Sequence, residues 1–186
     1  AFKRRPSDAV VVQEGWTHAG RDDIWSQAGF LDSRYFDRPN TIGSGLFTLS
    51  RLPITADDFW PYTLDGRLLR IWEGDRLSAK GISLVHVMKD GVPFDIFNTH
   101  TLSRQQDRNA PSDDYTPERM AQFFEAFDFI VTHRFADAFV FGGDMNSKQN
   151  SDEIIFWKKL SGLETTHLSG PNSCTYCPPN TYATGD

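Results

Sequence analysis

The stretch F-G-G-D-M-N-S at residues 141–147 constrains the fold of this chain more than any other segment. It ends a short apolar run, and its two glycines precede an aspartate and an asparagine, Asp144 and Asn146. An apolar run that ends in glycines and then presents a carboxylate and an amide is typical of a strand that delivers polar groups to the rim of a sheet. We therefore expect a strand here, followed by a sharp backbone turn at the glycines.

Two upstream segments end in the same way. V-V-V-Q-E ends at Glu14, and F-D-I-F-N-T-H ends at His100. Three apolar strands that each end in a strong hydrogen-bonding or metal-binding group suit a hydrolase of phosphate esters that uses a hard divalent cation, because the cation offsets the phosphodiester charge and activates water. Mg²⁺ prefers oxygen ligands and keeps several waters, so Glu14 is the candidate metal ligand.

Each of these side chains also has a plainer interpretation. A lone strand-end glutamate is usually solvated, and an aspartate and asparagine after glycines can form a polar turn held by side-chain-to-backbone bonds. Taken together, the groups favour catalysis. His100 can donate to a phosphate oxygen, Asp144 can orient or deprotonate the attacking water, and Asn146 can both donate and accept.

Length and composition indicate one soluble globular domain over residues 1–186. The chain is 39% hydrophobic and 24% charged, and its formal net charge is −6. An acidic chain does not suggest a broad basic face, so nucleic acid is a less expected partner than a phospholipid. No apolar run reaches the length of a membrane span, and we expect a monomer.

Hydrophobic patterning predicts a mixed α/β architecture. Strands are expected at 8–13 and 46–50, and at 82–88 and 92–99 as a hairpin around Asp90-Gly91. Between the first two strands, residues 15–40 are expected to hold a short helix and a long loop. Strands and helices in this order favour mixed sheets with helices packed outside.

Two helices are expected in the second half of the chain. One begins at Thr116, where a hydroxyl N-cap is followed by proline and an acid, and a second begins near Ser151 and stops at Gly162. The first has an apolar stripe that should dock on a sheet. Its members are Met120, Phe123, Phe124, Phe127, Ile130 and Val131.

The only two cysteines, Cys174 and Cys177, have the spacing C-x-x-C. A zinc site would need two more ligands, and His167 is the only histidine nearby. The pair does not open a helix after a strand, as a thioredoxin-like site would. A local disulfide and two free thiols both remain open, and the pair hints at an exported protein.

Four motifs together resemble the endonuclease/exonuclease/phosphatase superfamily. They are Q-E at 13–14, G-L-F-T-L-S-R-L-P-I at 45–54, N-T-H at 98–100 and G-D-M-N at 143–146. The resemblance runs from about Asp8 to Tyr182. It implies an α/β fold, a four-layer sandwich of two facing mixed β-sheets flanked by helices as in deoxyribonuclease. It also implies Mg²⁺, or another divalent cation such as Mn²⁺, on Glu14.

Within that superfamily the chain resembles the sphingomyelinase branch. The supporting segments are A-K-G-I at 79–82, F-N-T-H-T at 97–101 and T-Y-C-P-P-N-T-Y-A at 175–183, the last departing from the branch pattern at its tyrosine and cysteine. This resemblance implies hydrolysis of sphingomyelin to ceramide and phosphocholine, with substrate contacts at Lys80, Asn98 and Asn180. Lys80 taken alone fits a solvated strand lysine equally well.

The same resemblance leaves several alternatives open. Aromatic residues Trp60, Tyr62 and Trp72 suit either a bilayer interface or the core. We expect a secreted or membrane-peripheral protein rather than a cytoplasmic one.

Family members also carry an upstream Asn strand and a terminal Asp-His pair, which this sequence lacks. We therefore expect a fragment, or else a non-catalytic homologue that acts as a binding domain. A nuclease or an inositol-phosphate phosphatase of the same superfamily is the other alternative.

Overall fold

The computed structural model describes residues 7–37, 43–64, 78–104 and 115–164. Asn180, Trp72, Cys174 and Cys177 lie outside these ranges, so the predictions made for them concern residues that the structure does not describe.

The first sheet is antiparallel, with the strand order β1-β3-β2. Its strands are β1 (Ala9–Val12), β2 (Asp32–Tyr35) and β3 (Phe47–Ser50), and helix α1 (His18–Ala28) connects the first two. The Thr17 side chain caps α1 by accepting a hydrogen bond from the Gly20 N–H at 3.2 Å. Gly29 ends it in the left-handed conformation, with φ 66°.

The second sheet is mixed, with the order β4-β5-β6-β7. Its strands are β4 (Ile54–Pro61), β5 (Gly81–Lys89), β6 (Val92–His100) and β7 (Phe139–Asp144). The predicted hairpin of β5 and β6 is confirmed, and Asp90 and Gly91 at its tip both have positive φ. β7 pairs with β6 in parallel, which requires the crossover that helix α2 (Thr116–His133) supplies.

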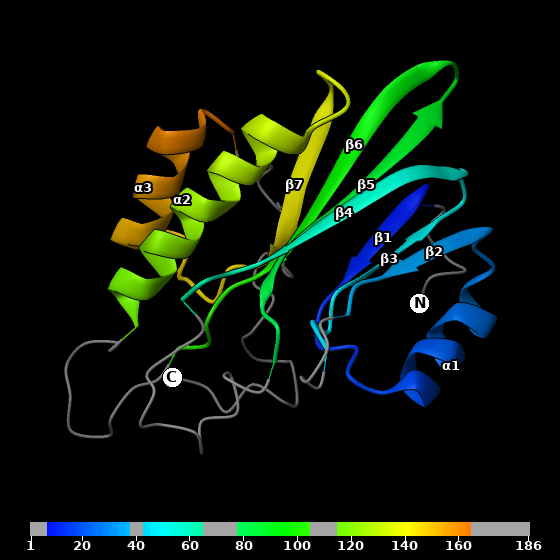
Figure 1. Ribbon diagram of the computed structural model, residues 1–186, viewed down its shortest axis with the longest axis horizontal. Coiled ribbons are helices and arrows are strands. Elements are labelled where there is room, and N and C mark those ends of the chain that lie inside the picture. The colour runs from blue at the N-terminus through cyan, green and yellow to red at the C-terminus, as the bar shows by residue number, and fades with distance from the viewer. Residues whose placement is uncertain (1–6, 38–42, 65–77, 105–114, 165–186) are drawn as a thin grey trace.

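Three separate apolar clusters lie between four layers. α1 packs on one face of the first sheet, the two sheets face each other, and α2 with α3 (Asp152–Ser161) covers the far face of the second sheet (Figure 1). β1 shows the period-2 alternation that such layering needs. Val10 and Val12 join the cluster under α1, whereas Ala9 and Val11 join the one between the sheets. The four-layer sandwich is thus confirmed, although the described strands of the first sheet are all antiparallel.

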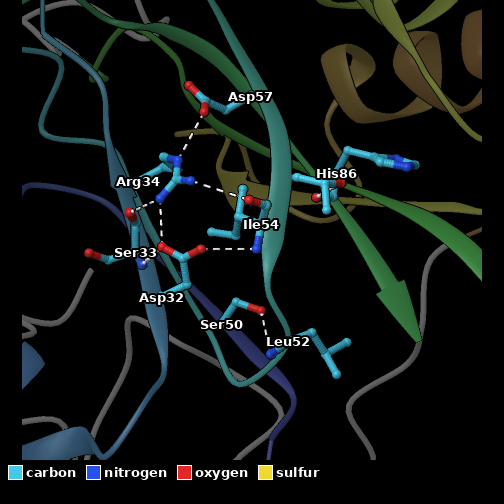
Figure 2. A network of polar contacts seen from close by, with 9 residues as sticks. Asp32, Ser33, Arg34, Ser50, Leu52, Ile54, Asp57 and His86 are labelled. Atoms are coloured by element: carbon cyan, nitrogen blue, oxygen red, sulfur yellow. Dashed lines mark hydrogen bonds and ion pairs between the residues drawn. The ribbon is translucent and has the colours of Figure 1, made fainter. Parts of the chain in front are cut away.

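A polar network joins the edge strands of the two sheets (Figure 2). The Arg34 guanidinium on β2 donates to Asp32 at 2.6 Å and to Asp57 on β4 at 2.9 Å. The other Asp32 oxygen accepts the Ile54 N–H at 3.0 Å. Burial would raise the pKa of Asp32, but hydrogen bonds from the Ile54 N–H, Arg34 and the Ser33 N–H, with the Arg34 charge, outweigh it and hold this pKa below its ordinary value.

Three features of the fold differ from the sequence-based expectations. β2 lies in the segment predicted to be helix and loop, and β4 was not predicted. Both are edge strands, β2 (DSRY) with two charged residues and β4 (ITADDFWP) with two adjacent aspartates at its centre, and neither shows a clear apolar alternation. On α2, Phe124 and Val131 are more than half exposed, while Arg119 and Gln122 are fully buried. The face that docks on the sheet is therefore partly polar.

Candidate active site

The ends of β6 and β7 bring two of the predicted catalytic residues together. His100 and Asp144 are register partners in the parallel pair, and the Thr101 N–H donates to the Asp144 carbonyl at 3.0 Å just beyond it. His100 is buried, with 1% of its surface exposed, whereas Asp144 is exposed. Parallel strands present their carboxyl ends at the same sheet edge, which is why two distant sequence motifs meet here.

Glu14 reaches the same region from the first sheet. It follows β1 with a positive φ of 59°, which is uncommon for a residue with a side chain. The neighbouring Gly15 N–H donates to the Gly45 carbonyl at 2.9 Å, which fixes the bend. Among the described residues, no hydrogen bond or ion pair engages the Glu14 carboxylate, and the residue is exposed. The carboxylate is thus open to a ligand.

Asn98 connects the Glu14 strand to the His100 strand. Its side chain is fully buried; the carbonyl oxygen accepts from Gln13 Nε2 at 2.6 Å, and its amide donates to the Val12 carbonyl at 3.0 Å. Because Gln13 precedes Glu14, this amide pair ties the candidate metal ligand to β6, two residues before His100.

Lys80 is not a solvated strand residue. It is 2% exposed, and its Nζ lies 3.1 Å from His100 Nε2 and 3.0 Å from the Thr101 carbonyl oxygen. The Trp16 ring lies on another side of His100, with ring centroids 6.4 Å apart. A buried cation beside an imidazole gives this site two groups suited to an anionic substrate.

Asp144 and Asn146 form a tight polar turn. Asp144 Oδ1 accepts the Asn146 N–H at 2.9 Å, and Asn146 has a positive φ of 46°. The Asn146 side chain donates to the Thr101 carbonyl at 3.0 Å, so this carbonyl receives both Lys80 and Asn146. A polar turn held by a side-chain-to-backbone bond therefore exists, and the exposed Asp144 within it is the register partner of His100. The structural and the catalytic interpretations are compatible.

The sequence predicted a sharp turn at the two glycines of the central motif, and this prediction is wrong. Both lie within β7. Gly143 is required for a different reason: it has φ 137°, and a Cβ there would lie 2.0 Å from the Thr99 carbonyl oxygen. A Cβ at Gly142 would meet nothing within 4 Å. Gly143 therefore allows β7 to approach β6 closely just before Asp144.

Some polar residues support the site through contacts that could not be predicted from the sequence. Tyr62 is 1% exposed and its hydroxyl lies 2.6 Å from Thr99 Oγ1, so it is a core residue and not an interface aromatic. Gln122 is fully buried on α2 and bonds to Leu102. No local pattern marks either residue, because their partners are distant in the chain. Trp16 could have been found more easily, because it lies two positions after the predicted metal ligand Glu14.

The described residues fit a magnesium site of the simplest kind. They contain no cluster of three His, Cys, Asp or Glu side chains that could hold a metal ion. Mg²⁺ does not need such a cluster, since it is commonly held by one or two carboxylates and several waters. Glu14, with its open carboxylate, is the residue in this part of the chain that fits that role.

Two facing sheets with helices outside, and a Glu, a His and an Asp-x-Asn turn at their rim, define the class of this protein. The model of the Endonuclease/Exonuclease/phosphatase family matches residues 2–186, and the chain belongs to this family.

Within the family the chain is similar to proteins that act on sphingolipids. It is 30% identical over 182 residues to sphingomyelin phosphodiesterase 2 from Rattus norvegicus, which covers 87% of this chain and 42% of that relative. The chain thus spans less than half the length of this relative.

Solved structures show the same fold. The crystal structure of SmcL superimposes with a TM-score of 0.74 at 23% identity, covering 89% of this chain and 59% of the other. Beta toxin from Staphylococcus aureus, solved with bound magnesium ions, gives a TM-score of 0.72 at 18% identity, covering 89% and 61%.

None of the helices in the described part of the chain is long and apolar enough to span a membrane. Of the aromatic residues in the segment after β3, Trp60 is 44% exposed, and its indole N–H donates to Glu125 at 3.2 Å.

Proposed function

We propose that this chain is the catalytic part of a divalent-metal-dependent sphingomyelin phosphodiesterase, which hydrolyses sphingomyelin to ceramide and phosphocholine. One observation carries the proposal: His100 and Asp144 are paired in register, and the Gln13–Asn98 bond ties Glu14 to the same strand. The similarity to sphingomyelin phosphodiesterase 2 supports this choice of substrate.

Glu14 would hold Mg²⁺ or Mn²⁺ together with waters, and the bound cation would offset the charge of the phosphodiester. The beta toxin solved with magnesium ions supports this choice of metal. The exposed Asp144 carboxylate would orient the attacking water and take its proton. The bond between the water oxygen and phosphorus would form in line as the bond from phosphorus to the ceramide oxygen breaks. Asp144 would keep the water proton, and the ceramide oxygen would take up a proton from solvent as it leaves.

His100 and Lys80 would stabilise the negative charge on the phosphoryl oxygens. Their nitrogen atoms lie 3.1 Å apart and both side chains are almost fully buried, so the two would act together as one hydrogen-bonded pair. Asn146 would contact a phosphate oxygen or the metal from the turn after β7. Asn98 is fully buried and uses its amide on Gln13 and Val12, which supports a role in placing Glu14, and its contact with substrate stays a proposal. Asn180 stays a proposed substrate contact.

The test is release of phosphocholine from sphingomyelin vesicles with Mg²⁺ present. We expect Glu14→Gln and His100→Ala to lose about 10²-fold or more in kcat, the scale for removing one group that stabilises transition-state charge. Glu164→Gln is the matched control, because it removes an exposed carboxylate after α3. Activity in both active-site variants equal to the wild type would contradict the proposal.

A parallel assay on supercoiled DNA separates lipid hydrolysis from nuclease activity. With a net charge of −6, the chain is expected to nick DNA far more slowly than it cleaves lipid. Faster cleavage of DNA than of sphingomyelin would transfer the chemistry to a nuclease. We also propose a membrane surface as the place of action, outside the cell or peripheral to a membrane, because the proposed substrate is a bilayer lipid.

A further inference from the structure

Helix α2 carries three polar residues at intervals of three positions: Arg119, Gln122 and Glu125. Residues three apart lie on one face of a helix, so these side chains form a row. Arg119 and Gln122 are fully buried although the helix docks on an apolar sheet. Buried polar groups are costly unless they are hydrogen-bonded, so their partners indicate what the row does.

Gln122 bridges two separate segments. Its Oε1 accepts the Leu102 N–H at 2.9 Å, and its Nε2 donates to the Leu64 carbonyl at 2.5 Å. A backbone N–H can only donate and a carbonyl can only accept, so the orientation of the amide is fixed by its partners. A carboxylate or an apolar side chain of the same size cannot make both bonds.

The residues on either side of Gln122 contact the same two segments. The Arg119 guanidinium donates to the Ser103 carbonyl at 3.4 Å, next to Leu102. The Glu125 carboxylate accepts the Thr63 N–H at 2.9 Å, next to Leu64. The row on α2 therefore holds residues 63–64 and residues 102–103 at a fixed separation, and Gln122 is the member that contacts both.

The segment of residues 102–103 leads directly into the candidate active site. Leu102 follows Thr101, whose carbonyl accepts Lys80 Nζ and Asn146 Nδ2, each at 3.0 Å. The Thr101 N–H donates to the Asp144 carbonyl at 3.0 Å. A shift of Leu102 would therefore move the backbone group on which Lys80, Asn146 and Asp144 all depend.

We propose that Gln122 is a positioning residue for catalysis, acting through Leu102 on the Thr101 backbone that holds Lys80, Asn146 and Asp144. The catalytic part of this inference rests on the proposed phosphodiesterase function. The placement of Thr101 by Gln122 does not, and it can be measured without any substrate. A residue on the buried face of a docking helix would then set the geometry of groups that act on the phosphate.

The experiment compares Gln122→Leu and Gln122→Glu with Val87→Ala. Val87 is 1% exposed in the cluster between the sheets and pairs with Phe94 near the hairpin end, away from His100. It therefore reports what a loss of core stability alone does to activity. Gln122→Glu keeps an acceptor for Leu102 and loses the donor to Leu64, so it is the milder variant should Gln122→Leu not fold.

The first readout is kcat and KM on sphingomyelin vesicles with Mg²⁺. We expect Gln122→Leu to lower kcat about tenfold or more with KM within about twofold, Gln122→Glu to lower kcat less, and Val87→Ala to keep kcat within about twofold. A kcat for Gln122→Leu within about twofold of Val87→Ala would reduce Gln122 to a structural residue. Because Gln122→Glu keeps the bond to Leu102, a loss of kcat in that variant as large as tenfold would contradict action through Leu102, whether or not Gln122→Leu folds.

The second readout is nitrogen-15 NMR of the substrate-free protein. We expect the Leu102 amide to lose about tenfold or more in hydrogen-exchange protection in Gln122→Leu, with shifted resonances for Thr101 and the Asn146 side chain, and no such change in Val87→Ala. Unchanged resonances and protection would overturn the proposal. A wild type that cleaves no phosphodiester would defeat the proposed function instead, and the NMR comparison would still decide whether Gln122 places Thr101.

Discussion

Gln13 Nε2 and Asn98 Oδ1 lie 2.6 Å apart, and this hydrogen bond links the two sheets beside Glu14. The Asn98 side chain makes a second bond between the sheets by donating to the Val12 carbonyl at the end of β1. Asn98 is fully buried. If its side chain were removed, Gln13 Nε2 and the Val12 carbonyl would each lose a hydrogen-bond partner in a site that water does not easily reach. The strand that carries Glu14 and the strand that carries His100 are thereby held in one relative position.

Replacing Asn98 by alanine is expected to weaken both the fold and the site. The free energy of unfolding should fall by about 2 kcal/mol, the scale for leaving buried polar partners unsatisfied, and phosphodiesterase activity should fall with it. Denaturant unfolding of Gln13→Ala, Asn98→Ala and the double variant measures the pair directly. We expect the two single losses to exceed the double loss by about 0.5 kcal/mol or more. Strict additivity would show that the two amides do not act on one another.

Gly143 and Gly142 form a matched pair of sites for an alanine substitution. At Gly143 the new Cβ would meet the Thr99 carbonyl at 2.0 Å with φ at 137°, whereas at Gly142 it would meet nothing within 4 Å. We expect Gly143→Ala to cost about 3 kcal/mol or more and to abolish activity by displacing Asp144. Gly142→Ala should change stability by less than about 1 kcal/mol. Thermal unfolding of both variants checks this, and equal losses would contradict the assigned role of Gly143.

The Asp32 network between the edge strands predicts a pH-dependent contribution to stability. Hydrogen bonds and the Arg34 charge hold the pKa of Asp32 below its ordinary value despite burial, so the folded state favours the ionised carboxylate. The contribution is therefore fully present above about pH 4 and is lost as the pH falls through the lowered pKa. We expect Asp32→Asn to cost about 1 kcal/mol at pH 7 and progressively less below about pH 4.

Asp57→Asn is the control for that measurement. Asp57 binds the same guanidinium at 2.9 Å but is more exposed, with 41% of its side-chain surface accessible, and makes no bond to Ile54 in the described residues. Its substitution should cost well under 1 kcal/mol, as exposed ion pairs do. Urea unfolding of the three proteins across acid pH gives the comparison. A loss for Asp32→Asn that does not vary with pH would contradict the role of its ionised form.

The sequence predicted those parts of the fold in which local pattern and tertiary environment agree. The β5–β6 hairpin has a turn signal and two apolar strands, and α2 and α3 have clear start or stop residues, so all of them are confirmed. β2 and β4 were missed because an edge strand needs little apolar pattern. The polar face of α2 was missed because the hydrogen-bond partners that allow Gln122 to be buried are backbone groups of Leu64 and Leu102, which are distant in the chain.

The residues of the candidate active site also divide into those that local pattern predicts and those that it does not. Glu14, His100, Asp144 and Asn146 each follow an apolar run, so their place at a sheet edge was predictable from the sequence. The buried state of Lys80 was not, because the lysine precedes β5 and its partners lie twenty residues downstream, at His100 and Thr101. Contacts of that kind depend on strand pairing, which a single sequence does not specify residue by residue.

Tyr62 provides the last prediction, at alkaline pH. Burial raises the pKa of this phenol, so the folded state keeps the hydroxyl protonated. Thr99 Oγ1 donates to the Gly81 carbonyl at 3.0 Å, and therefore the Tyr62 hydroxyl is the donor in its 2.6 Å contact with Thr99. The contribution of the protonated Tyr62 hydroxyl to the free energy of unfolding is fully present below the unfolded-state pKa of about 10 and is lost as the pH rises above that value.

Replacing Tyr62 by phenylalanine should therefore cost about 1 kcal/mol at pH 7, where the hydrogen bond is lost. The stability gap between wild type and variant should narrow above about pH 10, because only the wild-type unfolded chain gains this phenolate there. Phenolate absorbance on alkaline titration should be the same for the folded wild type and folded Tyr62→Phe, with the Tyr62 phenolate appearing only when the wild type unfolds. A gap independent of pH, or full titration of all tyrosines in the folded protein, would show that Tyr62 is not held as a buried donor to Thr99.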